Sequence, residues 1–208
     1  MIDRKAHWEG VYASRSPREV SWYQQEPALS LRLIANAGLA LDAPLIDIGG
    51  GASVLVDRLC DEGYGNIAVL DVSIRALEAA RERLADKADL VEWYAQDVTG
   101  FRPLHRFSLW HDRAVFHFLT EKADREKYVD VLRQALLPGG QVIIMTFAIG
   151  GPQKCSGLDI IQYDADKLMG ELGQGFELLE NGREIHYTPA GGQQEFAYFR
   201  FFRTHSDC

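Results

Sequence analysis

Four aspartates stand at or just after the ends of short apolar segments, where their side chains can meet a ligand. A carboxylate accepts hydrogen bonds from paired hydroxyl groups and attracts a cationic group. The first aspartate opens the pattern Asp47-x-Gly49-x-Gly51, whose glycines let the backbone approach a ligand closely. These residue types favour a ligand with hydroxyl groups and a positive charge. Taken singly, each acid is also typical of a strand-end cap; the four are Asp47, Asp71, Asp97 and Asp112.

The glycine spacing separates two classes of cofactor. A dinucleotide fingerprint has the form G-x-G-x-x-G and places a pyrophosphate on a helix N-terminus. Counted from Gly49, the third glycine position is occupied by Val54, so this fingerprint fails. Asp47 would also repel a diphosphate. A nicotinamide dehydrogenase is therefore disfavoured, while a loop shaped only for packing a helix on a strand remains an alternative.

The elements that would position these residues alternate along the chain. Apolar runs at 45–48, 67–70, 90–94, 107–111 and 141–148 predict strands, and helical patterns at 54–62, 74–84 and 125–137 lie between them. Ser73 is a suitable helix N-cap, and a sharp turn is expected at Leu137-Pro138-Gly139-Gly140. This alternation predicts a parallel sheet with helices on both faces, which binds ligands beyond the carboxyl ends of its strands.

The C-terminal part departs from the alternation. A helix is expected at Ala165–Leu172, followed by strands at 176–186 and 195–203 that only a short turn joins. Two strands so connected must be antiparallel neighbours, because a parallel pair needs a long crossover. The predicted fold class is therefore α/β: a Rossmann-like, doubly wound sheet of seven strands, mostly parallel, with a C-terminal antiparallel hairpin. Residues 150–159 are expected to form a surface loop.

This layout resembles that of the class I S-adenosylmethionine (SAM) methyltransferases, by motif over about residues 40–148 and by topology in the tail. Asp71 follows Asp47 by 24 residues, close to the interval of roughly 20 at which such sheets place an acid on ribose hydroxyls. Ser53 stands where many family members have a third glycine. The resemblance implies a cofactor site for the methionine, ribose and adenine parts of SAM, made in chain order by Asp47, Gly49 and Gly51, then Asp71 and Val72, then Asp97 and Val98.

The activity that the resemblance implies is methyl transfer from SAM, with S-adenosylhomocysteine (SAH) as product. In-line transfer needs alignment, and a protonated acceptor also benefits from a base. Asp112 and His111 follow the fourth strand and are the predicted catalytic residues. Asp112 could instead border the cofactor's amine or form a salt bridge with Arg113, which is the role we expect for that arginine. His117, between two phenylalanines, is expected to be a core or rim residue.

The methyl acceptor is predicted only as a protein lysine or a small molecule. The segment at 110–119 is similar to that of a subgroup containing citrate-synthase lysine methyltransferase and its bacterial relatives. The alternative function is a non-enzymatic protein of the same fold, which binds SAM or a partner without turnover. Labelled product from methyl-labelled SAM distinguishes the two.

The N-terminal region precedes every predicted strand. We expect one domain over residues 1–208, with residues 1–40 as a helical lid or cap and residues 41–208 as the Rossmann-like core. Trp8 and Tyr12 share one face of a helix. They either cover the cofactor, as the N-terminal helix does in many methyltransferases, or pack as part of a purely structural helix. A second helix is expected after Pro27, ending near Gly38.

Composition limits the partners. A net charge of −8 argues against a nucleic acid held by electrostatic attraction, and the longest strongly apolar run, 142–149, is too short to span a membrane. The N-terminus has no apolar signal core. Three widely spaced cysteines indicate neither a disulfide framework nor a metal site, and they fit a reduced cytoplasmic setting. Cys155 is either a reactive, metalloid-binding thiol or an inert loop residue.

Overall fold

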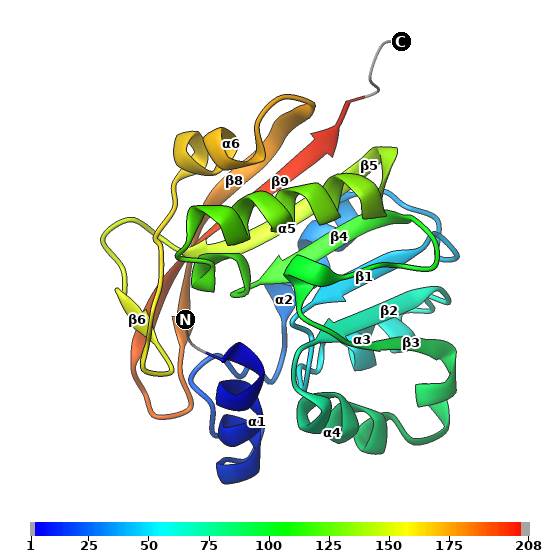
Figure 1. Cartoon of the computed structure of the whole chain (residues 1–208). Coiled ribbons are helices and arrows are strands. Elements are labelled where there is room, and N and C mark those ends of the chain that lie inside the picture. The colour runs from blue at the N-terminus through cyan, green and yellow to red at the C-terminus, as the bar shows by residue number, and fades with distance from the viewer. Residues whose placement is uncertain (1–2, 205–208) are drawn as a thin grey trace.

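The main sheet contains seven strands in the order β3-β2-β1-β4-β5-β9-β8 in the computed structural model, which describes residues 3–204 (Figure 1). Five strands pair in parallel, and β9 is antiparallel to both β5 and β8. The fold class is the predicted one. The strands are β1 (Leu45–Ile48), β2 (Ile67–Asp71), β3 (Val91–Ala95), β4 (Phe107–Arg113), β5 (Leu136–Phe147), β8 (Phe176–Tyr187) and β9 (Gln193–Arg203).

Helices cover both faces of the sheet (Figure 1). The sheet therefore separates two hydrophobic cores, one under each layer of helices. α2 (Ala28–Asn36), α3 (Leu55–Asp61) and α4 (Ile74–Leu84) pack on one face, and α5 (Lys122–Ala135) and α6 (Ala165–Leu172) on the other. Successive strand residues point to opposite faces. Leu109 therefore joins the core under α2 to α4, while its neighbour Trp110 joins the core under α5 and α6.

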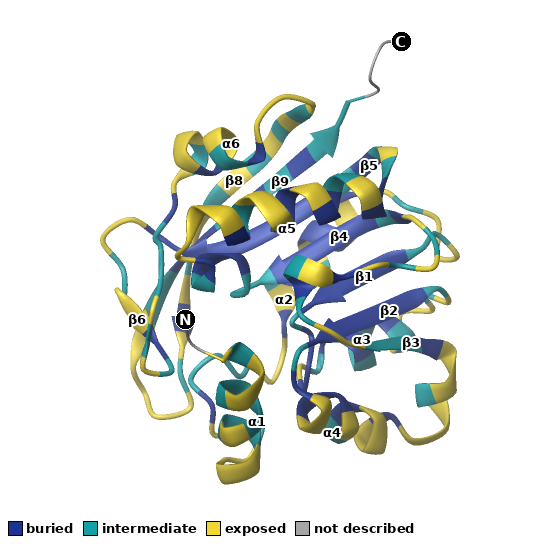
Figure 2. Cartoon of the chain, in the orientation of Figure 1, coloured by how far each residue is buried: buried dark blue, intermediate teal, exposed yellow. Residues whose placement is uncertain are grey.

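Local signals set most element ends. Ser73 caps α4, since its side chain accepts a hydrogen bond from the Ala76 N–H. Gly38, with φ +64°, follows the end of α2. Short 3₁₀ turns lie at η1 (Ala85–Leu90), η2 (Val98–Gly100) and η3 (Phe116–Phe118). Burial follows these elements, with buried strands and an exposed outer side on α5 (Figure 2). Within residues 3–204, no helix is both long and apolar enough to cross a membrane.

Two segments differ from expectation. The predicted turn at 137–140 lies inside β5: Phe107 pairs with Leu136, but Leu109 pairs with Gln141, so β5 carries extra residues there. Gly139, at φ +79°, accommodates this irregularity. In the predicted surface loop, β6 (Lys154–Cys155) and β7 (Leu158–Asp159) form a small antiparallel pair. Pro-Gly-Gly is typical of a turn, but here β5 continues through it as an irregular strand because it pairs with β4 on one side and with β9 on the other.

Candidate cofactor and acceptor site

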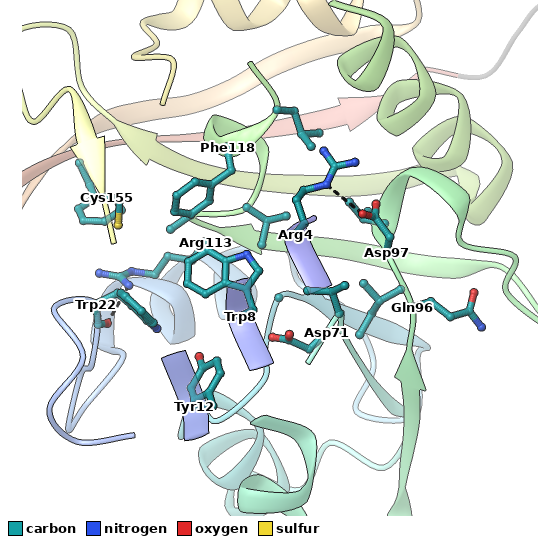
Figure 3. Close-up of a pocket in the computed structure, with 18 residues that line it drawn as sticks. Arg4, Trp8, Tyr12, Trp22, Asp71, Gln96, Asp97, Arg113, Phe118 and Cys155 are labelled. Atoms are coloured by element: carbon teal, nitrogen blue, oxygen red, sulfur yellow. Dashed lines mark hydrogen bonds and ion pairs between the residues drawn. The ribbon is translucent and has the colours of Figure 1, made fainter. Parts of the chain in front are cut away.

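A pocket lies at the carboxyl ends of the parallel strands, beneath α1 (Arg4–Ser14) (Figure 3). This is where an open parallel sheet places its ligands. Seven of the residues predicted for the cofactor line it: Trp8, Tyr12, Gly49, Asp71, Val72, Asp97 and Val98. The rest of the lining is Arg4, Trp22, Leu70, Gln96, Arg113, Ala114, Val115, Phe118, Leu119, Cys155 and Phe196.

The turn after β1 needs its glycines for close packing. Gly49 has φ +66°, and a Cβ there would overlap the Val115 side chain. Gly51 has φ +33°, and a Cβ there would overlap the Asp71 carboxylate. The Gly49 N–H donates to the Leu70 carbonyl at 2.7 Å, which ties the turn to the end of β2. The glycines thus bring two pocket residues, Val115 and Asp71, against the turn, although Gly51 itself is not among the lining residues.

Asp71 stands at the end of β2, as the ribose interpretation requires. Its carboxylate accepts a hydrogen bond from the Ser73 N–H at 2.8 Å, which fixes its orientation. The pKa of Asp71 is raised to about 7, chiefly by burial and to a smaller extent by the negative charges of Asp47 and Glu9, while its backbone hydrogen bonds oppose the rise. Near neutral pH this pocket carboxyl is therefore divided between its charged and neutral forms.

Asp97 follows β3 and connects the pocket to α1. One carboxylate oxygen accepts from the Thr99 N–H at 2.9 Å and the Thr99 hydroxyl at 2.7 Å. The other accepts from Arg4 Nε at 3.0 Å, and Arg4 Nη1 also donates to Asp124 at 2.9 Å. The residue predicted to hold adenine is thus also where α1 is tethered (Figure 3).

α1 lies against the pocket by its aromatic side, and the polar side chains Arg4 and Glu9 tie it to neighbouring elements. Trp8 makes edge contacts with Trp22 and Phe118, at centroid distances of 5.5 and 5.1 Å. On the side opposite Arg4, Glu9 accepts from the Ile74 N–H at 2.6 Å, at the start of α4. No residue of α1 is buried (Figure 2). The helix is therefore held by edge contacts and ion pairs.

Asp47 and His111 lie side by side outside the pocket lining. They are paired across β1 and β4, and His111 Nδ1 lies 2.7 Å from an Asp47 carboxylate oxygen. His111 Nε2 lies 3.0 Å from the Ser30 hydroxyl on α2. Asp47 and His111 are 3% and 2% exposed. This arrangement braces β1, β4 and α2 together, and it gives His111 no access to an acceptor in the pocket.

Asp112 is fully buried and committed to the turn after β4. Its carboxylate accepts from the Tyr128 hydroxyl at 2.6 Å and from the N–H groups of Val115 at 2.9 Å and Phe116 at 3.1 Å. Burial raises the pKa of Asp112 to about 6, although these hydrogen bonds oppose the rise. Asp112 does not line the pocket. The expected salt bridge with Arg113 is wrong, because adjacent strand residues point to opposite faces.

Arg113 points instead into the pocket, a placement that the sequence analysis missed (Figure 3). Nη1 donates to the Trp22 carbonyl at 3.1 Å, and the guanidinium lies 4.4 Å from the centre of the Phe196 ring. Nε and Nη2 are shielded from solvent and have no hydrogen-bond partner within residues 3–204. Burial lowers the pKa of Arg113 to about 10, so the side chain stays charged at neutral pH. The alternation of side chains along β4 could have indicated this placement, because it puts Arg113 on the opposite face of the sheet from Asp112.

Cys155 and His117 are both buried, and burial keeps both side chains uncharged at neutral pH. Cys155 is 4% exposed, and burial raises the pKa of its thiol to about 11, so it is not a thiolate at neutral pH. His117 is buried, its Nδ1 accepts from the Phe147 N–H at 3.3 Å, and burial lowers its pKa to about 3. The expectation of a core histidine is confirmed. Cys60 and Cys155 are both free thiols, whereas Cys208 lies outside the described residues.

Comparison with known proteins indicates the class of enzyme. Residues 46–142 match the family model described as a methyltransferase domain. Human EEF1A lysine methyltransferase 2 is 26% identical over 197 residues, which cover 86% of this chain and 76% of the relative. The matched segment and the relative both indicate a SAM-dependent methyltransferase.

Solved structures show the same fold at low identity. A SAM-dependent methyltransferase from Anabaena variabilis is 17% identical with a TM-score of 0.75, covering 98% of this chain and 96% of that one. The N-methyltransferase NodS from Bradyrhizobium japonicum, solved with SAH, is 17% identical with a TM-score of 0.73, covering 98% and 100%. At this identity, the likeness to the two structures shows the fold alone.

Proposed function

We propose that SAM is held in the pocket beneath α1, with its ribose on Asp71 and its adenine beside Asp97 and Val98. The observation that supports this most is that one pocket gathers the strand-end residues Asp71, Val72, Asp97 and Val98 and the α1 aromatics Trp8 and Tyr12. A ribose offers two hydroxyl donors, which suits a carboxylate acceptor. The methionine part then lies toward Gly49 and Ala114.

SAM, when bound, supplies a sulfonium methyl group to a nucleophilic atom; the S–CH₃ bond breaks, its electron pair stays on sulfur, and SAH is released. Asp71 and Asp97 orient the adenosine part, while Trp8 and Tyr12 cover the pocket and exclude water. Residues 1–40 thus serve as the lid region of a single domain. Asp47 contributes indirectly, by fixing β1 against His111.

We do not retain His111 and Asp112 as bases. Their polar atoms are engaged with Asp47, Ser30 and Tyr128, away from the pocket. The chain's contribution to the transfer is then alignment and exclusion of water, and an acceptor that carries a proton gives it to solvent. The human relative is named as a lysine methyltransferase and NodS as an N-methyltransferase, so nitrogen acceptors are the first to test here. With two free thiols, the cytoplasm is the proposed setting.

The test is a calorimetric titration with SAH, followed by incubation of the enzyme and methyl-labelled SAM with a cell extract. We expect SAH to bind and a labelled product to form. Absence of SAH binding would contradict the proposed site. SAH binding with no labelled product would instead support the alternative of a non-enzymatic protein of this fold.

A further inference from the structure

Arg113 is positively charged, and its surroundings satisfy only part of its hydrogen-bonding capacity. Of its guanidinium nitrogens, Nη1 donates to the Trp22 carbonyl, while Nε and Nη2 are shielded from solvent without a partner within residues 3–204. A shielded, unpaired charge is costly, and a guanidinium forms its strongest pairs with planar anions that accept two parallel hydrogen bonds. The unmatched donors are therefore suited to a carboxylate.

No acid within residues 3–204 supplies that partner. Glu184 on β8 lies close enough to act on Arg113 electrostatically, but it forms no ion pair with it among the described residues, and Glu184 Oε2 is itself shielded without a partner. Asp112, the sequence neighbour, is directed to Tyr128 on the other face. Arg113 is thus left facing the pocket with a positive charge that an incoming ligand can pair.

The position of Arg113 separates this charge from the adenosine site. In Figure 3, Arg113 lies with Trp22 and Cys155 at one end of the pocket, while Gln96 and Asp97 lie at the other. Phe196 of β9 lies under the guanidinium. The end of the pocket beyond the cofactor residues therefore combines aromatic walls with one fixed positive charge.

We propose that this end of the pocket is the acceptor site and that it selects small acceptors carrying a carboxylate, which the guanidinium of Arg113 binds. The inference rests on the proposed cofactor site. It disfavours a lysine ammonium as acceptor, because a guanidinium whose charge is only partly exposed to solvent repels a second cation. Trp22 and Phe196 supply apolar surface for the remainder of the acceptor.

The acceptor is not the only source of a carboxylate for Arg113, because the methionine part of SAM also carries one. The two sources are separated by comparing SAH with 5′-methylthioadenosine, which lacks the amino-acid part. If Arg113 serves the acceptor, Arg113→Met leaves the ratio of the two affinities unchanged. If Arg113→Met weakens SAH about tenfold or more but leaves methylthioadenosine unaltered, Arg113 holds the cofactor and the proposal is overturned.

The direct test titrates three probes into the SAH-saturated enzyme. Phenylacetate, phenylacetamide and phenethylamine share an aromatic ring and are anionic, neutral and cationic. We expect phenylacetate to bind about tenfold or more tightly than phenylacetamide, with phenethylamine weakest. Arg113→Met should abolish this order, and the matched control Arg81→Met, at an exposed position on α4, should keep it.

The outcomes separate this inference from the proposed function. Wild-type protein that fails to bind SAH contradicts the cofactor site. Wild-type protein that binds SAH but prefers the amide or the amine contradicts the acceptor inference alone, and this comparison needs no variant to fold. A methylated lysine as the labelled product in the extract assay would also overturn the inference, whereas a low-molecular-mass carboxylate product would support it.

Discussion

Adjacent residues at the end of β4 have opposite roles, and the reason is the two-residue period of a strand. His111 and Arg113 face the side of α2 and α3, whereas Asp112 faces α5 and Tyr128. From their opposite charges and adjacent positions, the sequence predicts a salt bridge between Asp112 and Arg113. Geometry forbids that pair, turns the acid into a support for the turn after β4 and leaves the arginine available to a ligand.

At Asp71, we predict that Asp71→Asn weakens SAH binding without weakening the fold. The amide keeps the shape but loses the charged acceptor for ribose hydroxyls, at a cost of about 1.5–3 kcal/mol, or about 10- to 100-fold in Kd. Thermal stability should hold, because burial disfavours the charge that is removed. Calorimetry on this variant and on Asp89→Ala, an exposed control, checks it. Unchanged affinity in a folded Asp71→Asn protein would rule out the ribose role.

Asp71 also predicts a dependence on pH. Its folded-state pKa of about 7 lies above the ordinary value of 3.8. The stability that it contributes is therefore fully present below about pH 4 and is lost as the pH rises through 7. Ribose binding has the opposite sign, since the ionised form is the stronger acceptor. We expect SAH affinity to rise by up to about tenfold from pH 6 to 8, with a flat profile for Asp71→Asn.

For Asp112, the structural role predicts an effect on stability alone. Tyr128→Phe removes a donor to the Asp112 carboxylate and leaves the Trp110 N–H without its 2.8 Å partner. We expect a loss of about 1–3 kcal/mol in the free energy of unfolding, measured with urea, and an unaltered Kd for SAH. Tyr64→Phe, whose hydroxyl has no hydrogen bond within residues 3–204, is the matched control. Equal stability of the two variants would refute the bracing role.

Among the elements, α1 is attached to the rest of the molecule without burying any of its residues. An isolated helix of its 11 residues is marginal in water, and none of its residues is buried. Its attachments are edge contacts and partly exposed ion pairs, such as Arg4 with Asp97, each of which contributes about 0.2–1 kcal/mol. Such a helix can open and close at small energetic cost, as a cover for a ligand site must.

A double substitution on the inner face of α1 tests the lid. Trp8→Ala with Tyr12→Ala removes the aromatic cover and should raise the Kd for SAH by about tenfold or more, mainly through faster dissociation. The control Lys5→Ala, on the exposed side of the same helix, should bind as wild type does. Stopped-flow measurement of SAH release gives the rate. If dissociation is unchanged, α1 is a structural helix only.

The periodic elements were the predictable part of the fold. The apolar runs at β1 and β2 are short and buried, so Asp47 and Asp71 could be placed near strand ends from sequence. The pairing of Asp47 with His111 could not, because it depends on the register between strands that are distant in the chain. The irregularity at Gly139 likewise depends on the pairing of β4 with β5. Arg4 and Arg113 entered the site only through tertiary placement.

Across the whole molecule, the pocket collects residues from the beginning of the chain to its last strand. It lies where the strand order reverses between β1 and β4, and its lining extends from Arg4 on α1 to Phe196 on β9. A ligand bound there touches elements that are separated by nearly the full length of the chain. Its binding energy is therefore lost when the domain unfolds, and it appears as global stability.

This coupling gives the last prediction. SAH at a concentration of 100 times its Kd should stabilise the protein by about 2.7 kcal/mol. A chain of this size gains about 2–4 °C in Tm per kcal/mol, so we expect a rise of about 5–11 °C. NAD at the same concentration should produce no shift, because Val54 stands at the third glycine position of the dinucleotide fingerprint, so the turn after β1 lacks the shape that receives a pyrophosphate. Differential scanning calorimetry measures both shifts on one sample series, and a rise with NAD but none with SAH would overturn the assignment of the pocket to SAM.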